Sequence, residues 1–439
     1  MTNGSPMKLI LGFSVPLLFG FLFQQFYNLM DTLIVGRFLG VDDLAAVGST
    51  GSVNFLIIGF CMGVCNGFAI PLAHKFGAGD YKGMRGFMMN AIYLSAIFAV
   101  VMTIVTVIFC MPILELMRTP ENIIDGAYRY IVIIFWGIPV TYLYNLVSGI
   151  IRSMGDSRTP VVFLVIAAVI NIGLDLFFIV VLGTGVEGAA WATVISQLIS
   201  CILVLWCLYK SEGSYQLRFS KLQIKGVYLK QIFQVGIPAG IQSMIINFSN
   251  VLLQSSVNSF GSTAMAGYTA ANNILGFLYA AVNSITQACM SFTSQNYGVG
   301  KYKRMDKVLI DCLILTVVVA GVLGCGSYLL GPEILRIYTE EEKVIRCGME
   351  ILSITTVPYF LCGIMDLFPG ALRGMGYSAV PMILSIIGTV GMRVVWIFGI
   401  FPHYRSLYVL FISYPGSWLF TIIMQVICFY FVRKKIHQM

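Results

Sequence analysis

The amino-acid sequence predicts an all-α polytopic membrane protein with twelve transmembrane helices in two homologous six-helix lobes. First, charged residues make up only 10% of the 439-residue chain and apolar residues 58%, with a mean hydropathy of +0.87. Soluble domains carry roughly 25% charged residues. Second, the apolar residues gather in about twelve long stretches. Third, the first half of the chain is repeated in the second half.

The apolar stretches define the predicted spans. Each is roughly 20 residues or longer, which at about 1.5 Å per residue crosses about 30 Å of hydrocarbon. They are centred near residues 22, 60, 98, 139, 171, 198, 244, 281, 318, 360, 389 and 419. The polar residues 1–8 lead into a long span that itself holds polar side chains, which is unlike a cleavable signal peptide. We therefore expect the first span to remain in the mature protein.

An internal repeat relates the two halves at an offset of 221 positions. Residues 152–155 (Arg-Ser-Met-Gly) return as residues 373–376 (Arg-Gly-Met-Gly), and residues 77–82 return as residues 298–303. Two homologous halves in an apolar chain are typical of a transporter with its pathway between them.

The repeat also predicts the domain organisation. We expect an amino-terminal lobe at 1–209 and a carboxyl-terminal lobe at 229–439, joined by a cytoplasmic linker at 210–228. An amphipathic helix on the membrane surface is the alternative interpretation of the linker.

The basic residues predict the orientation of the spans. With the amino terminus inside, 19 of the 27 lysines and arginines lie on the cytoplasmic side and seven outside, and Arg393 remains within a span. Because cytoplasmic loops are enriched in such residues, we expect a multi-pass plasma-membrane protein with both termini cytoplasmic. The net charge of +8 then reflects topology and requires no nucleic-acid partner.

The sequence contains no recognisable catalytic or metal-binding motif. The eleven cysteines lie mainly in spans without histidine or carboxylate companions, which is typical of packing residues. No P-loop, nucleophile motif or zinc spacing is present. We therefore expect no enzyme activity, no ATP-driven pumping by this chain alone and no cofactor.

Four ionisable residues inside the predicted spans are the main functional candidates: Asp31, Asp175, Asp366 and Arg393. A charge in hydrocarbon costs about 3 kcal/mol or more on insertion scales, so such groups normally face a bundle interior or a water-filled cavity. Asp366 occupies the repeat position of Asn145. Two interpretations of Asp366 stay open: it guides a cation from the cytoplasm, or it is simply hydrated near the end of its helix. For Arg393 we favour a structural ion pair over substrate contact.

Depth estimates place oxygen ligands from three spans near one level. At about 1.5 Å per residue, Asp31 lies about 8 Å, Thr193 about 9 Å and Asp175 about 12 Å below the outer surface. Asn171 shares the helix face of Asp175, one turn deeper. Two carboxylates, an amide and a hydroxyl suit a hard cation such as Na⁺, or a proton shared by desolvated carboxylates. Helix packing through hydrogen bonds is the alternative, and it is preferred for Asn171 and Thr193 taken alone.

A combination of motifs resembles a known transporter family. It comprises Gln24, Tyr27, Asn28 and Asp31 in the first span, Arg152, Gly155 and Pro160 before the fifth, Asn171 with Asp175, and Gly188-Ala189-Ala190 followed by Thr193. Together, and over essentially the whole chain, these residues resemble the MATE family, the multidrug and toxic compound extrusion transporters.

The resemblance implies an antiporter that exports organic, often cationic compounds in exchange for Na⁺ or H⁺, with the lipid bilayer as its surroundings. It assigns Asp31, Asn171, Asp175 and Thr193 to the cation or proton site, with Tyr27 and Asn28 as a supporting network. Candidate residues of the substrate cavity are Gln24, Asn145, Gln242, Asn247 and Asp366. One branch of the family has a glutamate in span 7 where this chain has Ile246. We expect a functional monomer.

Two other functional classes fit parts of the sequence less well. A lipid-linked oligosaccharide flippase has a related architecture, but its pyrophosphate cargo favours a basic cavity, and Arg393 is the only basic residue deep in a span. A membrane enzyme would need a catalytic cluster. The sequence leaves the substrate and the choice between Na⁺ and H⁺ open.

Overall fold

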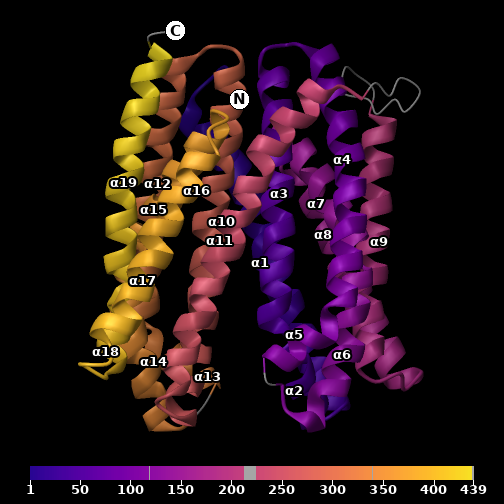
Figure 1. Cartoon of the computed structure of the whole chain (residues 1–439), viewed down its shortest axis with the longest axis vertical. Helices are drawn as coiled ribbons and strands as arrows, with labels where there is room; N and C mark the ends of the chain where they lie inside the picture. Colours follow the sequence, from indigo (N-terminus) through magenta and orange to yellow (C-terminus); the bar gives the residue numbers. More distant parts are fainter. Residues whose placement is uncertain (118, 212–223, 339, 438–439) are drawn as a thin grey trace. The chain divides into compact units, whose positions relative to one another are not determined.

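A computed structural model describes residues 1–117, 119–211, 224–338 and 340–437, and every regular element in these ranges is helical (Figure 1). Within them, ten helical stretches are long and apolar enough to cross a membrane, and two further bent helix pairs bring the number to twelve if each pair is one span. The predicted all-α membrane fold is confirmed, and all twelve predicted centres fall within these stretches.

The first half of the chain supplies six of the stretches. They are formed by α1 (Pro6–Phe38), α3 (Gly51–Gly77), α4 (Tyr81–Ile108), the bent pair α6 (Glu121–Trp136) and α7 (Ile138–Ser153), α8 (Arg158–Leu176) with its π-helical extension Phe177–Val181, and α9 (Val186–Lys210). Two short helices, α2 (Val41–Ser49) and α5 (Cys110–Leu116), connect them.

The second half repeats this order. The spans are α10 (Gly226–Asn258), α11 (Ser262–Gly298), α12 (Tyr302–Leu329), the bent pair α14 (Glu342–Thr355) and α15 (Tyr359–Gly374), an interrupted span, and α19 (Ser413–His437). The interrupted span consists of α16 (Ala379–Ser385), a π-helix at Ile386–Gly391, α17 (Met392–Val395) and a second π-helix at Trp396–Ile400. The short helices α13 (Gly331–Tyr338) and α18 (Leu407–Phe411) connect the spans.

The two bent pairs break at equivalent points of the repeat. The bend between α6 and α7 is 46° at Gly137, and the bend between α14 and α15 is 50° just before Tyr359. Pro139 lies in the first turn of α7, and Pro358 immediately precedes α15. A proline has no backbone N–H to donate to the preceding turn, so a helix restarts at these positions in a new direction.

The chain forms two compact units by its internal contacts. The amino unit is Phe19–Gly240, and the carboxyl unit is Met1–Leu18 together with Ile241–Met439. The first residues of α1 therefore pack with the second half of the chain, as when Phe13 meets the ring of Phe292 edge-on at 5.8 Å. The lobe boundaries at 1–209 and 229–439 stay a prediction. Residues 212–223 of the predicted linker lie outside the described residues.

Within the amino unit, α10 begins in direct backbone contact with α3. A Cβ atom built on Gly67 would lie 2.5 Å from the Cα of Gly236. Only glycine allows this approach, and small residues at such crossings are typical of membrane helices, where close packing replaces the hydrophobic driving force.

The loop before α4 and its repeat before α12 are held in different ways. Asp80 caps α4, because its Oδ1 accepts from the Gly83 N–H at 2.9 Å and its Oδ2 pairs with Lys75 at 3.0 Å. The Gly83 hydrogen bond, followed by the Lys75 contact, lowers the pKa of Asp80 below its ordinary value. In the repeat, Lys301 replaces the aspartate, and its Nζ instead donates to the Thr2 carbonyl at 2.9 Å.

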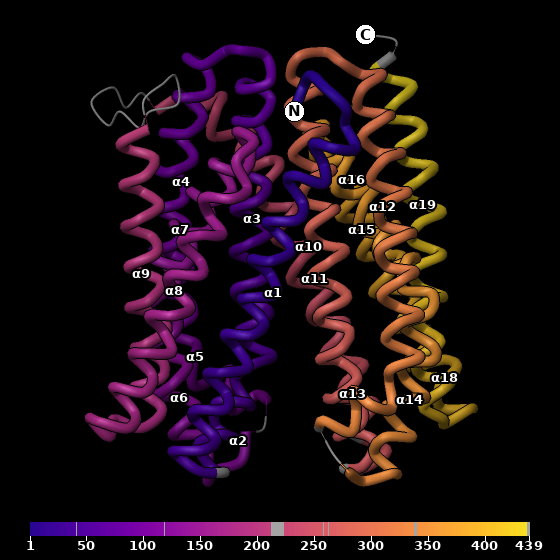
Figure 2. Tube along the Cα trace, turned by 180° about the vertical axis from the view of Figure 1, so that it is seen from behind, coloured from indigo at the N-terminus to yellow at the C-terminus, as the bar shows by residue number. Residues whose placement is uncertain are grey.

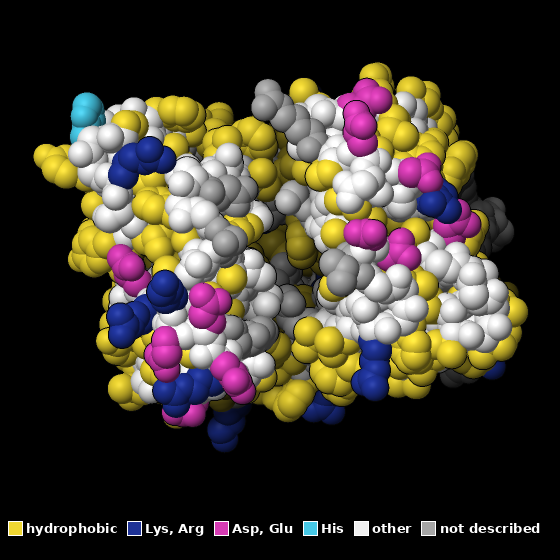
Figure 3. All heavy atoms as spheres, turned by 90° about the horizontal axis from the view of Figure 1, so that it is seen from below, with side chains coloured by type: hydrophobic (Ala, Val, Ile, Leu, Met, Phe, Trp, Pro, Cys, Tyr) yellow, Lys and Arg dark blue, Asp and Glu magenta, His cyan; other side chains and the backbone are white. Residues whose placement is uncertain are grey.

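Charged side chains occupy the helix ends and apolar side chains the sides. In the carboxyl unit, both chain termini lie at the same end of the helices (Figures 1 and 2). Figure 3 looks onto the opposite ends of the helices of each unit and shows acidic and basic side chains there, together with apolar side chains. Along the sides, residues such as Val181, Leu329 and Phe398 are exposed, as expected of lipid-facing helices.

Candidate ion-binding site

Three helices of the amino unit bring the four predicted ion-site residues together. Asp31 lies on α1 and is 9% exposed, whereas Asn171 and Asp175 lie on α8 and are fully buried. Thr193 lies on α9 and is half-buried. The Tyr27 hydroxyl donates to Thr193 Oγ1 at 3.4 Å, which links α1 to α9.

The two carboxyl groups form the centre of this cluster. Asp31 and Asp175 lie within hydrogen-bonding reach of each other. One oxygen of each, Asp31 Oδ1 and Asp175 Oδ1, is buried without a hydrogen-bond partner among the described residues. Two ionised carboxylates so close together repel each other in a buried site. A proton or a cation held between them removes the repulsion and supplies the missing partner.

Asn171 connects the carboxyl pair to α9. In one orientation of its amide, Nδ2 donates to Thr193 Oγ1 at 3.4 Å. With oxygen and nitrogen exchanged, the nitrogen donates to Asp175 Oδ2 at 3.0 Å and the oxygen accepts from the Thr193 N–H at 3.2 Å. The second orientation is favoured because it gives shorter hydrogen bonds and pairs a carboxylate oxygen with a donor.

The chemistry of the cluster suits a monovalent ion. In the described parts of the chain, no group of three or more histidine, cysteine, aspartate or glutamate side chains is arranged to hold a metal ion. The cluster instead combines two carboxylates with neutral amide and hydroxyl oxygens. Hard oxygen ligands of low total charge fit Na⁺, and the orphaned carboxylate oxygens fit H⁺ equally well.

The other predicted residues of the amino unit lie on α1 and on α7. Asn28 is exposed, and Gln24 is half-buried on α1. Asn145 is half-buried on α7, where its Nδ2 donates to the Thr141 carbonyl at 2.8 Å. Their assignment to a supporting network and a substrate cavity stays a prediction.

Tyr130 of α6 is a buried tyrosine that the sequence analysis did not single out. It is 8% exposed, and the charges of Asp31 and Asp175 act on its hydroxyl. A tyrosine in an aromatic and aliphatic stretch gives no sequence signal, because only the packing of α6 shows that it is buried within electrostatic range of the carboxyl pair.

Among the predicted residues of the carboxyl unit, Gln242 is part of a polar network. Gln242 is 3% exposed, and its Nε2 donates to Ser385 Oγ at 2.9 Å. Its Oε1 accepts from Arg373 Nη2 at 2.9 Å. Asp366 and Asn247 are half-buried, and Arg373 is the cation that acts on Asp366. Gln242 therefore makes structural contacts, and the place of these residues in a cavity stays a prediction.

Asp311 is a further buried acid that the sequence analysis did not single out. It lies on α12, is 9% exposed, and has its Oδ2 buried without a hydrogen-bond partner among the described residues. It lies shortly after the basic stretch at 301–307, where an acid near a helix end is common, so its position in the sequence does not mark it as functional.

Arg393 does not form the expected ion pair with a described residue. Its Nε donates to Ser417 Oγ at 3.4 Å, and its Nη1 donates to Ser249 Oγ at 3.2 Å and to Asn250 Oδ1 at 2.9 Å. The guanidinium carbon lies 4.2 Å from the centre of the Tyr414 ring. Neutral acceptors and the face of an aromatic ring hold this buried cation in place of a carboxylate.

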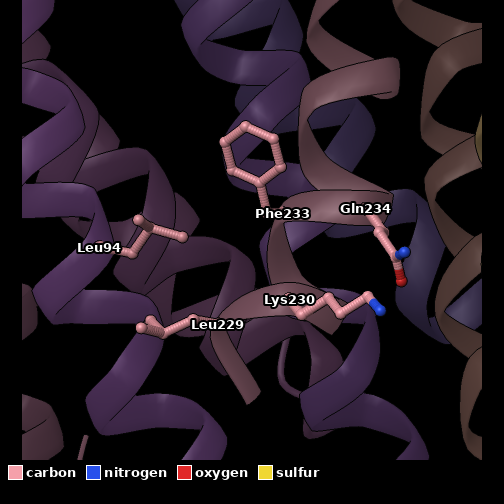
Figure 4. A pocket seen from close by; sticks show the side chains of 5 residues that line it. All are labelled: Leu94, Leu229, Lys230, Phe233 and Gln234. Carbon is pink, nitrogen blue, oxygen red and sulfur yellow. The ribbon is translucent and has the colours of Figure 1, made fainter. Parts of the chain in front are cut away.

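A groove on the amino unit lies apart from these residues. It has a volume of about 410 Å³ and is lined by Leu94 of α4 and by Leu229, Lys230, Phe233 and Gln234 of α10 (Figure 4). None of the predicted cavity residues lines it, so it gives no support to their assignment.

The sequence of this chain matches a family model and known proteins. The family model described as MatE matches residues 16–177 and again residues 238–398, which reproduces the internal repeat. A probable multidrug resistance protein of Bacillus subtilis, YoeA, is 29% identical over 436 residues, covering 96% of this chain and 93% of that protein. The probable multidrug resistance protein NorM of Thermotoga maritima is 24% identical over 375 residues, covering 83% and 79%.

Solved structures have the same fold. A crystal structure of MATE in complex with MaL6 superimposes with a TM-score of 0.92 at 24% identity, covering 100% of this chain and 98% of that chain. An outward-facing multidrug resistance MATE family transporter gives a TM-score of 0.91 at 22% identity, with the same coverage.

Proposed function

The chain belongs to the MatE family, and from this premise we propose that it exports drug-like organic compounds in exchange for Na⁺ or H⁺ held by Asp31 and Asp175. The family consists of multi-pass membrane transporters, not enzymes, and the two relatives described above are probable multidrug resistance proteins. The plasma membrane as location, cytoplasmic termini and function as a monomer are parts of the proposal.

One observation carries the proposed coupling. Asp31 and Asp175 come from different helices, lie within hydrogen-bonding reach, and each has a buried oxygen without a partner among the described residues. A pair of this kind changes its interaction from repulsion to attraction when a cation or proton enters. Occupation of the site is therefore expected to draw α1 towards α8.

The sequence of α1 offers a place where such a movement can be absorbed. Pro16 lies inside α1 and Pro238 inside α10, and neither can donate a backbone hydrogen bond. Each of these helices belongs partly to one compact unit and partly to the other. The boundary between the units lies two residues after the proline, between residues 18 and 19 in α1 and between residues 240 and 241 in α10. We expect α1 to bend near Pro16 when the charge of the carboxyl pair changes.

Coupling then follows from differential affinity. If the ion binds one arrangement of α1 more tightly than the other, it shifts the population of the two arrangements by that difference. A drug that prefers the opposite arrangement is released as the ion binds. A coupling free energy of about 1–3 kcal/mol is typical of linked sites.

Dye efflux from proteoliposomes tests the proposal. A Na⁺ gradient and a pH gradient are imposed in separate experiments. The wild-type protein is expected to export a fluorescent organic cation under one of them, and the gradient that drives export identifies the coupling ion. Asp31→Asn is expected to reach the membrane at wild-type levels and to lose gradient-driven efflux. Asp42→Asn, an exposed acid on α2, is the matched control. Full efflux by Asp31→Asn would overturn the assignment.

The oligosaccharide flippase is not favoured, because the two relatives described above are probable multidrug resistance proteins and the candidate site in the amino unit is acidic.

A further inference from the structure

The partners of Arg393 on α10 correspond to ion-site residues on α1. Ser249 and Asn250 lie 222 positions after Tyr27 and Asn28. The prolines inside the two helices are related by the same offset, so each pair begins 11 residues after its proline. The α10 side of the Arg393 cluster is thus the repeat counterpart of the α1 side of the ion site.

The partners on α19 correspond to α9 in the same way. Tyr414 and Ser417 lie 221 positions after Thr193 and Ser196, which is the general offset of the repeat. Thr193 is the hydroxyl of the ion site, and Tyr414 covers one face of the guanidinium at 4.2 Å.

Arg393 itself corresponds to Asn171, with one inserted residue. Pro160 and Pro381, at the starts of the two helices, are 221 positions apart, whereas Asn171 and Arg393 are 222 apart. The π-helix at Ile386–Gly391 lies between Pro381 and Arg393. A π-helical segment accommodates one additional residue in a helix and is frequent at functional sites. It brings Arg393 to the position that Asn171 occupies in the amino unit.

The two equivalent sites therefore carry opposite charge. The amino unit has two carboxyl groups where the carboxyl unit has a guanidinium that is 3% exposed. None of the ion pairs found within 4.0 Å in the described residues includes Arg393. A buried cation without a counter-charge is costly, so its retention points to a ligand of opposite charge.

The guanidinium retains a group able to bind such a ligand. Nε and Nη1 donate to neutral oxygens, whereas Nη2 makes no hydrogen bond to a described residue. Nη2 is not fully enclosed by the protein and keeps some accessible surface. Nη2 is therefore available to an incoming oxygen.

We propose that Arg393, supported by Asn250 and Ser417, binds the carboxylate or phosphate group of the exported compound. The proposal rests on the proposed function, since it takes the bound compound to be the transport substrate. Guanidinium groups bind both kinds of anion through charge-assisted hydrogen bonds. The substrates would then include amphipathic compounds with an acidic group, in addition to organic cations.

Direct binding to the purified full-length protein tests the proposal. Fluorescence polarisation is measured with rhodamine 6G, a cationic ethyl ester, and with its free acid, which differs by one carboxylate. Arg393→Gln is expected to weaken binding of the free acid about ten- to a hundredfold, as the loss of a charge-assisted hydrogen bond implies, and to leave the ester unchanged. Competition by acetate or by inorganic phosphate at constant ionic strength distinguishes the two kinds of anionic group.

Two variants separate ligand binding from a structural role. Arg393→Lys keeps the charge and is expected to retain part of the preference for the free acid, while Arg405→Gln, an exposed arginine of the same unit, is expected to change nothing. Equal effects of Arg393→Gln on both dyes, or no binding of the free acid by the wild type, would overturn the proposal. Failure of gradient-driven efflux, with the binding difference intact, would overturn the proposed function alone.

Discussion

Asp175→Asn gives the sharpest expected change in stability. The substitution keeps the shape of a fully buried side chain but removes one of the two charges at the ion site. Two unit charges about 4 Å apart interact by about 4 kcal/mol at the effective dielectric constant typical of proteins. In the ion-free protein at alkaline pH this interaction is repulsive, so Asp175→Asn is expected to be the more stable form there.

The same change removes the response to the coupling ion. A ligand present at about one hundred times its Kd stabilises the folded state by about 2.7 kcal/mol. The wild-type protein is expected to gain stabilisation of this order from Na⁺ or from acidification, whichever ion couples, and Asp175→Asn is expected to gain little.

Thermal unfolding of detergent-solubilised protein, followed by intrinsic fluorescence across a series of Na⁺ concentrations and pH values, measures both effects. Choline replaces Na⁺ in the control series, so that ionic strength stays constant. An Asp175→Asn variant with the same ion-dependent stabilisation as the wild type would refute the reasoning, because the site would then not require the second carboxylate.

Three further predictions concern single contacts. Tyr27→Phe removes a hydrogen bond of about 1 kcal/mol and is expected to weaken ion affinity about fivefold, which lowers the ion-dependent stabilisation by about 1 kcal/mol; an unchanged response would contradict the proposed link between α1 and α9. Gly67→Leu is expected to destabilise the protein by about 1–3 kcal/mol in thermal unfolding, because the side chain meets the α10 backbone, whereas Gly48→Ala has open space and serves as the control. Asp80→Asn is expected to cost less than about 1 kcal/mol at neutral pH, because it removes the exposed ion pair with Lys75 but keeps an acceptor for the Gly83 N–H. Because the pKa of Asp80 is lowered in the folded protein, its contribution is present above the ordinary aspartate pKa and is lost as the pH falls through the lowered value, so wild type and variant should converge in acid.

Hydropathy and the repeat predicted the spans because both depend only on residue type and spacing. All twelve predicted centres lie in the observed helical stretches. The bends near Gly137 and Pro358 were not predicted, since hydrophobicity does not distinguish a straight span from two angled helices. The packing of the first residues of α1 with the carboxyl unit was not predicted either, because it depends on tertiary contacts and not on residue type or spacing.

The sequence predicted the depth of the candidate site in the membrane but not the contacts of its side chains. Counting residues from the helix ends placed Asp31, Asp175 and Thr193 at similar depth, and the structure brings them together. Depth gives no information on which way a helix is turned about its axis. For that reason the sequence did not reveal that Tyr130 is buried within electrostatic range of the carboxyl pair, or that Arg393 is held by hydroxyls, an amide and a ring.

Equilibrium cation binding to the purified protein tests the central claim most directly. Bound Na⁺ is counted with a radioactive tracer, and proton uptake is counted with a pH indicator in the same samples. The wild type is expected to take up one Na⁺ or H⁺ per chain that the Asp31→Asn/Asp175→Asn double variant does not take up. Equal uptake by the wild type and the folded double variant would contradict the assignment of the coupling ion to this carboxyl pair.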